Sequence, residues 1–353
     1  MGFEDYSTDS RGDIGSWIRE ASMVGFLEII PLIIKLDSIS TSKQWWKTEL
    51  NARIFGNLLK QSVERIDRVR SCAGRILLEL LYMKKNDADC WVIEIPGRDV
   101  LQKVLPKWVK LIRWINPSEL YPRMVKLLVI PEYRFDLLTG LVLAAGGISE
   151  SLVRYSSSKL LDYASTLSID PPYVSSSESK VSLTEFAKSL LDIAQHFQKH
   201  DRIIIPLLEV VDLLFEAGTL QKINNEKEFL ELFECVKKEV TKCKDIRKLT
   251  ACMKVFCGMS SLSGTVRNKA LYHLLNLLVH PFPKIRRSTA DQLYLTLSGS
   301  VEEETEESLE IEEILTNTDW NESVSKLKEI RNRLYPLLDI KPPVLKSSLS
   351  TTT

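Results

Sequence analysis

The sequence predicts an all-α protein, built as an α-solenoid of degenerate helical repeats. Apolar residues recur at three- and four-residue steps in nearly every segment, which is the period of a helix with one buried face. Runs of strict apolar–polar alternation, the sign of a half-buried strand, are almost absent. A short arginine pattern also recurs along the chain. With 353 residues the chain exceeds one compact core, so an extended array or two domains are expected.

The predicted helices follow the chain in order. The first, 14–36, contains Pro31, which we expect to kink or break it. Residues 137–148 carry no charge and are too few to span a bilayer as a helix, so they predict a buried core helix. The stretch 280–297 places Pro283 where a first helical turn tolerates proline. The remaining predicted helices are 53–66, 67–83, 134–145, 150–164, 183–199, 203–217, 226–242, 246–259, 266–279 and 324–338.

Other segments break the helical pattern and define the expected domain organisation. We expect a helical array over 1–300 with insertions near 84–100 and 168–180. Residues 301–317 predict a solvated acidic linker, because eight of the twelve residues in Glu302–Glu313 are acidic and none is basic. A terminal helix over 318–340 and a disordered tail over 341–353 complete the chain.

The arginine pattern is an aliphatic residue, Arg, two variable positions and a small residue. It occurs at Arg19, Arg70, Arg154, Arg267 and Arg286. It resembles the second-helix signature of HEAT and armadillo-like repeats, in which an acidic residue precedes the arginine by six positions. Asp13 before Arg19 and Glu64 before Arg70 keep that spacing, whereas Arg154 and Arg286 lack the acid. Arg267 lies only 19 residues before Arg286, so one of these two is not a repeat signature.

The composition and the missing motifs exclude several function classes. Basic and acidic residues balance at 47 each, which provides no overall field for nucleic acid. No phosphate-binding loop, nucleophile elbow or zinc-binding helix motif occurs, so we expect no enzyme, catalytic residue, cofactor or metal. His196 and His200 have a metal-compatible spacing but no accompanying ligands, which favours a solvated face. The six cysteines form no C-x-x-C pair and no secretory leader is visible, so a cytoplasmic protein with reduced thiols and no membrane insertion is expected.

Several separated blocks, in the right order, resemble the C-terminal region of the tubulin-folding cofactor D family. They are YSTDSRGDIGSWIREASM at Tyr6–Met23, ERIDRVR at Glu64–Arg70, PEYRFDLLTGLVLAAGGISESLVRYSS at Pro131–Ser157, VKKEVTKCKDIRKL at Val236–Leu249, VFCGM at Val255–Met259, FPKIRRSTADQLY at Phe282–Tyr294 and DWNESVSKLKEIRNRLYPLL at Asp319–Leu338. Family members are far longer, so the chain is interpreted as a C-terminal fragment or a truncated gene model.

The resemblance implies a chaperone that captures β-tubulin after the chaperonin and helps to join it to α-tubulin. The implied partners are β-tubulin, tubulin-folding cofactors C and E, and an Arf-like small GTPase, in an assembly that stimulates GTP hydrolysis by tubulin at the microtubule cytoskeleton. In the family the arginine credited with this stimulation comes from cofactor C. Two alternatives remain open: a general HEAT-repeat adaptor, and a direct GTPase-activating protein that supplies its own arginine.

Candidate partner contacts are Arg11, Trp17, Arg134, Arg286 and Arg287. Arg286 and Arg287 place two positive charges at a helix start, where the dipole is already positive. We expect Arg286 to pair with an acid of a neighbouring repeat and Arg287 to meet Asp291 one turn on. The alternative is that both arginines offer their charge to an acidic partner surface. Trp45, Trp46, Trp108 and Trp114 are expected in helical cores, with partner anchoring as the alternative.

Overall fold

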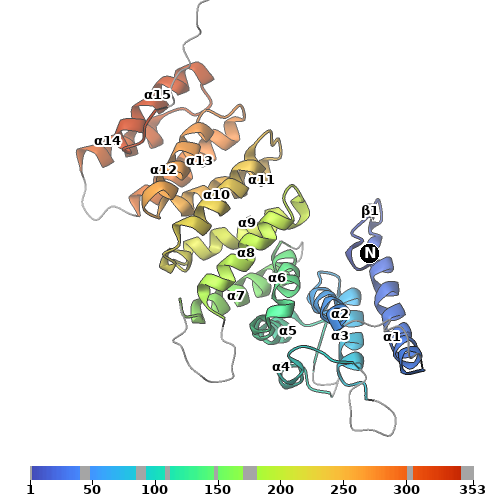
Figure 1. Ribbon diagram of the computed structural model, residues 1–353. Helices are drawn as coiled ribbons and strands as arrows, with labels where there is room; N and C mark the ends of the chain where they lie inside the picture. The colour runs from blue at the N-terminus through green and yellow to red at the C-terminus, as the bar shows by residue number, and fades with distance from the viewer. Residues whose placement is uncertain are drawn as a thin grey trace, which may run out of the picture. The chain divides into compact units, whose positions relative to one another are not determined.

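The computed structural model describes residues 2–39, 48–84, 93–107, 112–146, 150–169, 181–299 and 305–342. Over these residues the predicted all-α fold of paired, repeat-like helices is confirmed, with one two-stranded hairpin as the exception (Figure 1). The chain divides into two compact units, Met1–Ile223 and Asn224–Thr353. The division falls inside the segment predicted as a single array, 1–300.

The first unit contains most of the helices. Its elements are η1 Gly2–Glu4, β1 Thr8–Asp9, β2 Gly12–Asp13, α1 Gly15–Ile39, α2 Thr48–Gln61, α3 Asp67–Leu81, α4 Arg98–Val104, α5 Pro117–Met124, η3 Val125–Val129, α6 Pro131–Ala145, α7 Glu150–Thr166, α8 Leu183–His196, α9 Asp201–Glu216 and η4 Leu220–Lys222. The strands pair antiparallel, with Thr8 opposite Asp13 and Asp9 opposite Gly12.

Helix α6 forms the centre of the first unit, where it packs against α2, α7, α8 and α9. Every residue from Leu137 to Ala145 is buried, which confirms the predicted core helix over that range. Gly140 allows α2 and α6 to approach closely. A Cβ at this position would lie 2.7 Å from the main-chain oxygen of Lys60 and 2.6 Å from Cγ2 of Val63. The glycine is therefore required by the packing of the two helix backbones.

The first unit differs from the sequence prediction in three places. Helix α1 continues through Pro31, so the predicted break is wrong. Helices α4 and α5 were not predicted, because seven or eight residues are too few to show a helical period. The described part of the insertion near 84–100 is packed rather than free, since Ile93 and Ile95 are buried.

The tryptophan predictions have separate outcomes. The Trp114 ring is buried against α3, and a Cβ added at Gly74 would lie within 2.1 Å of it. Trp114 therefore has the predicted core position. Trp45, Trp46 and Trp108 lie outside the described residues.

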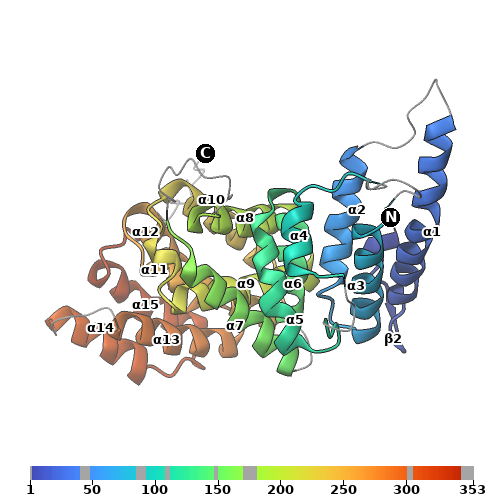
Figure 2. The same cartoon turned by 90° about the horizontal axis from the view of Figure 1, so that it is seen from below.

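The second unit is a succession of helices packed on one another (Figures 1 and 2). They are α10 Glu226–Val240, α11 Ile246–Ser260, α12 Gly264–Leu277, α13 Pro283–Ser298, α14 Glu306–Asn317 and α15 Val324–Leu337. Helix α11 packs against α10, α12 and α13 and carries a buried apolar face that includes Cys252, Phe256 and Cys257. Both cysteines are therefore part of the core of the second unit.

The linker predicted over 301–317 is wrong for Glu306–Asn317, which forms α14. Thr305 and Ser308 form a reciprocal capping box, and two glutamates occupy the first turn, where the helix dipole favours negative charge. Ile311, Ile314 and Leu315 are buried, and α14 packs on α13 and α15. The acidic composition concealed this amphipathic pattern. The predicted terminal helix, 318–340, begins at Val324, and residues 343–353 of the predicted tail lie outside the described residues.

Candidate partner-binding surface

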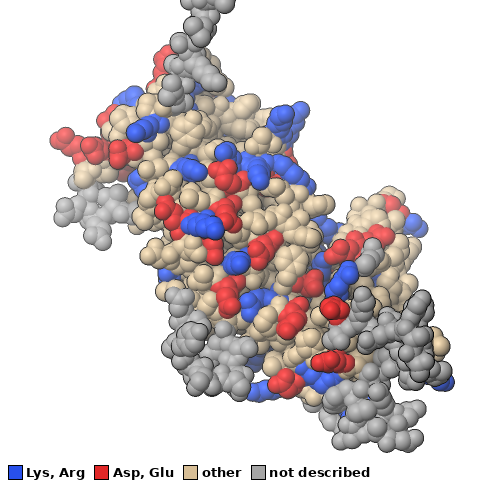
Figure 3. Space-filling view, viewed as in Figure 1, with Lys and Arg blue, Asp and Glu red and all other residues tan. Residues whose placement is uncertain are grey.

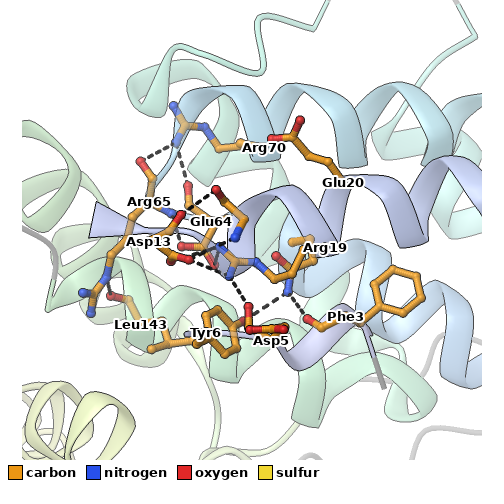
Figure 4. Close-up of polar contacts among 12 residues, drawn as sticks. Phe3, Asp5, Tyr6, Asp13, Arg19, Glu20, Glu64, Arg65, Arg70 and Leu143 are labelled. Atoms are coloured by element: carbon orange, nitrogen blue, oxygen red, sulfur yellow. Dashed lines mark hydrogen bonds and ion pairs between the residues drawn. The ribbon is translucent and has the colours of Figure 1, made fainter. Parts of the chain in front are cut away.

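A buried polar cluster fastens residues 2–13, here called the N-terminal strap, to the first unit. Arg19 of α1 is fully buried and donates to the Asp5 main-chain oxygen and to both carboxylate oxygens of Asp13, at 3.1 and 3.2 Å (Figure 4). Its guanidinium also lies 4.0 Å from the Glu64 carboxylate. Asp13 and Arg19, which keep the six-residue spacing of the repeat signature, therefore form an ion pair.

A second arginine holds the same carboxylate from α9. Arg202 donates to Asp13 at 3.1 Å, and the guanidinium carbons of Arg19 and Arg202 each lie 4.3 Å from the centre of the Tyr6 ring. Burial alone would raise the pKa of Asp13, but the hydrogen bond and charge of Arg19, with those of Arg202, outweigh it and hold the pKa below its usual value. Asp13 therefore connects α1 with a helix almost 190 residues later in the chain.

Two contacts from α2 complete the attachment of the strap. Lys60 is 3% exposed and its Nζ lies 3.1 Å from the Glu4 carboxylate. Gln61 donates to the Phe3 main-chain oxygen at 3.0 Å and to the Tyr6 hydroxyl at 3.1 Å. Because main chain and side chains are both held, the strap presents the β1–β2 hairpin in a defined position beside α1.

The hairpin brings together two predicted contact residues, Arg11 and Trp17. Arg11 pairs with Asp9 at 2.7 Å, and its guanidinium carbon lies 5.6 Å from the centre of the Trp17 ring. Trp17 remains 54% exposed. At protein interfaces, tryptophan and arginine are among the residue types most often found to contribute most of the binding energy.

Helix α1 continues this surface with an apolar stripe, defined as Ile18, Ile29, Leu32 and Leu36. These side chains are 47–61% exposed, and their spacing of 11, 3 and 4 residues places them on one helical face. A Cβ at Gly25, between them, would have no atom within 4 Å. The opposite face is covered, with Arg19, Met23 and Ile30 fully buried. The sequence itself indicates this stripe, because α1 carries apolar residues on two faces and one neighbouring element covers only one of them.

Arg134 and Arg286, by contrast, have structural partners. Arg134 of α6 donates through Nε to the Leu128 main-chain oxygen at 2.9 Å. Arg286 is 3% exposed, and its guanidinium donates to the main-chain oxygens of His280, Pro281, Trp320 and Glu322. The expected pairing of Arg286 with an acid of a neighbouring repeat is wrong, because main-chain carbonyls take that place.

Arg287 is the exposed member of the pair. The pKa of Asp319 is lowered, mainly by hydrogen bonds from Asn321 and to a smaller degree by the charge of Arg287. The described residues give no contact between Arg287 and Asp291, so the predicted pairing one turn on is not formed there. Arg287 therefore remains a surface cation.

His196 and His200, whose spacing is compatible with a metal ion, are both exposed, as the predicted solvated face requires. His196 and His200 both lie against Phe197, with ring centres at 4.6 and 6.2 Å. Among the described residues no cluster of His, Cys, Asp and Glu is arranged for a metal ion. None of the described helices is both long and apolar enough to cross a bilayer.

Comparison with known proteins identifies the family. The model of the tubulin folding cofactor D C-terminal region matches residues 52–248, more than half of the chain. The chain is 27% identical to the tubulin-specific chaperone D of Dictyostelium discoideum over 365 aligned residues, which cover 96% of this chain and 24% of that protein. It is 22% identical to the tubulin-folding cofactor D of Schizosaccharomyces pombe over 350 residues, with coverage of 95% and 29%. The chain spans about a quarter of the length of these relatives. Its helical-repeat fold and this end-to-end similarity show that the chain belongs to the tubulin-folding cofactor D family.

Proposed function

We propose that the chain acts as a scaffold in tubulin folding, binding β-tubulin after its release from the chaperonin. With cofactors C and E and an Arf-like small GTPase, it would support assembly of the αβ-tubulin heterodimer and activation of GTP hydrolysis, in the cytoplasm and at the microtubule cytoskeleton. Family membership carries this proposal, since relatives over the whole chain are named for tubulin folding.

We assign the tubulin contact to the surface formed by Arg11, Trp17 and the apolar stripe of α1. Three observations support this assignment. The apolar side chains lie on one helical face and are each 47–61% exposed, and exposed apolar patches mark binding sites when they are large. An aromatic–arginine pair lies at one end. The buried cluster around Asp13 and Arg19 fixes the position of the surface, which lowers the ordering cost of binding.

A binding experiment with labelled β-tubulin tests the assignment. The double substitution Leu32→Ser, Leu36→Ser and the single substitution Trp17→Ala should each weaken binding by about tenfold or more. Leu295→Ser is the matched control, because Leu295 is as exposed as Leu32 but lies on α13. Normal binding by both α1 variants would disprove the surface, whereas absence of binding by the unaltered chain would disprove the proposed function of this region.

The direct GTPase-activating alternative needs an arginine of this chain, and the adjacent Arg286 and Arg287 are its two candidates. Arg286 is buried among four carbonyl groups, so only Arg287 could reach a nucleotide. Single-turnover GTP hydrolysis by tubulin, with this chain as the only added factor, tests that alternative. We expect no stimulation, because the family resemblance implies that cofactor C supplies the stimulating arginine.

A further inference from the structure

A hollow in the second unit has no role in the proposal above. It has a volume of 350 Å³ and lies where the last residues of α13 and α15 meet α14 and the first turn of α12. Leu309, which lines it, is 50% exposed, so the hollow opens to solvent and can receive an apolar side chain. Its apolar lining consists of Leu297, Leu309, Ile311, Leu315, Leu337 and Leu338.

The rim of the hollow carries glutamates that have no cationic partner. Glu307 and Glu312 line the hollow, and Glu306 and Glu313 are their neighbours in the chain. All four are exposed, and the described residues form no ion pair with any of them. A row of acidic side chains accordingly follows α14 at the left edge of the molecule in Figure 3.

Two arginines lie near this rim without neutralising it. Arg333 of α15 pairs with Glu310, the fifth glutamate of α14, at 2.7 Å. Arg267 of α12 lines the hollow, and no described residue forms an ion pair or a hydrogen bond with its guanidinium. Over α14, its ion-pair partner and the lining residues, five carboxylates stand against two guanidinium groups, which leaves an excess of three negative charges.

The helix ends around the hollow also favour a positive charge. Ser298 is the last residue of α13 and Leu337 the last residue of α15, so the negative ends of two helix dipoles lie at the hollow. Neither helix has a basic residue in its last turn. The positive end of α14 is already satisfied, because Thr305 and Ser308 form a capping box and two glutamates occupy the first turn.

The length of the acidic rim indicates an extended occupant. Glu306 and Glu313 are separated by about 10 Å along the helix axis, at a rise of about 1.5 Å per residue. A single metal ion or amine covers only part of that length, and the described residues contain no carboxylate cluster arranged for a metal ion. Arg267 suits a peptide in addition, because an arginine can donate to main-chain oxygens, as Arg286 does in this fold.

We propose that the hollow binds a basic amphipathic segment of a partner protein. An apolar side chain of the segment enters beside Leu309, its lysine or arginine side chains pair with Glu307 and Glu312, and one of its main-chain oxygens accepts from Arg267. The negative rim repels nucleic acid and anionic lipid. The proposal does not depend on tubulin binding by α1.

The test uses the whole chain and a fluorescein-labelled peptide in which leucine and lysine recur at the helical period. Anisotropy should show saturable binding of this peptide and binding about tenfold weaker for oligolysine of equal charge. The double substitution Glu307→Gln, Glu312→Gln should weaken binding of the leucine–lysine peptide by about tenfold. Glu132→Gln, Glu216→Gln removes the same charge from exposed positions outside the hollow and should change the affinity less than about twofold.

Apolar substitutions locate the bound peptide. Leu309→Ser should weaken its binding by about fivefold or more, because the exposed leucine borders the hollow. Leu32→Ser, Leu36→Ser, on the apolar stripe of α1, should leave the affinity unchanged. Circular dichroism of each variant verifies that the helices are retained.

Several results would overturn the proposal. Absence of saturable binding, or equal weakening by the two glutamate pairs, would leave at most a non-specific attraction of charges. Equal affinity for oligolysine would show that the hollow takes no apolar side chain, and loss of binding in the α1 variant would move the peptide to the other surface. Removal of residues 343–353, which include Leu345 and Lys346, should not alter the affinity. A gain of about tenfold on this removal would identify the chain's own tail as the occupant in place of a partner.

Discussion

Arg286 Nε donates a hydrogen bond of 2.7 Å to the main-chain oxygen of Trp320, 34 residues later in the chain. Arg70 does the same to Trp114 at 2.5 Å. In both cases another guanidinium nitrogen donates to the main-chain oxygen six residues earlier, Glu64 or His280. Each arginine thus joins the turn before its own helix to a loop that precedes a later helix. At these two positions the recurrent pattern in the sequence corresponds to the same contacts to main chain, whereas Arg19 pairs with the Asp13 carboxylate.

Substitution of Arg286 should destabilise the second unit. Arg286→Ala removes the donor from four main-chain oxygens, of which those of Trp320 and His280 belong to a buried and a half-buried residue, at an expected cost of about 1–3 kcal/mol. Urea denaturation followed by circular dichroism measures this change. Arg287→Ala, on the exposed neighbour, should stay within about 0.5 kcal/mol. Equal stability of the two variants would contradict the anchoring role of Arg286.

Reversal of the charge at position 287 tests whether Arg287 contacts an acidic partner or only solvent. Arg287→Glu should leave the fold intact, because the favourable helix-dipole term opposes the repulsion from Asp319, each below about 1 kcal/mol. By contrast, Ile285→Asp puts a charge into a fully buried site and should unfold the unit. If Arg287→Glu binds tubulin and the partner cofactors with unchanged salt dependence, Arg287 is not part of an acidic-partner interface.

The strap should respond to pH through Asp13. Its pKa is lower in the folded chain than in the unfolded chain, so the stabilisation is present above the unfolded pKa of about 4 and is lost as pH falls through the folded value. Asp13→Asn should therefore cost about 1–3 kcal/mol at pH 7 and much less in strong acid. Asp162→Asn, at an exposed carboxylate of α7, is the control and should show no such pH-dependent difference.

Two glycines should respond oppositely to the same substitution. Gly140→Ala forces a methyl group against the α2 main chain and should cost about 1–3 kcal/mol. Gly25→Ala enters open space inside a helix and should stabilise the chain by about 0.5–1 kcal/mol. Thermal denaturation should show a lower melting temperature for Gly140→Ala and a higher one for Gly25→Ala than for the unaltered chain. A destabilised Gly25→Ala variant would show that the exposed face of α1 is packed in solution.

The sequence alone determined the features that depend on local periodicity and on short spacings. Long helices with an apolar face could be predicted because one buried stripe leaves a regular pattern, as in α9 and α10. The six-residue spacing of Asp13 and Arg19, noted in the sequence as a repeat signature, belongs to two residues that form an ion pair. The family was visible in separated blocks of residues, without reference to the fold.

Only the tertiary structure decided which charges remain exposed and which surfaces remain uncovered. Arg286 and Arg287 are adjacent and chemically alike, yet Trp320 and Glu322 bury the first, while the second stays in solvent. The acidic run became α14 because α13 and α15 cover its few apolar residues, a contact that composition cannot show. The apolar stripe of α1 likewise depends on which neighbours are present. Burial is a property of the packed neighbours, many of them distant in sequence, and local pattern carries no information about them.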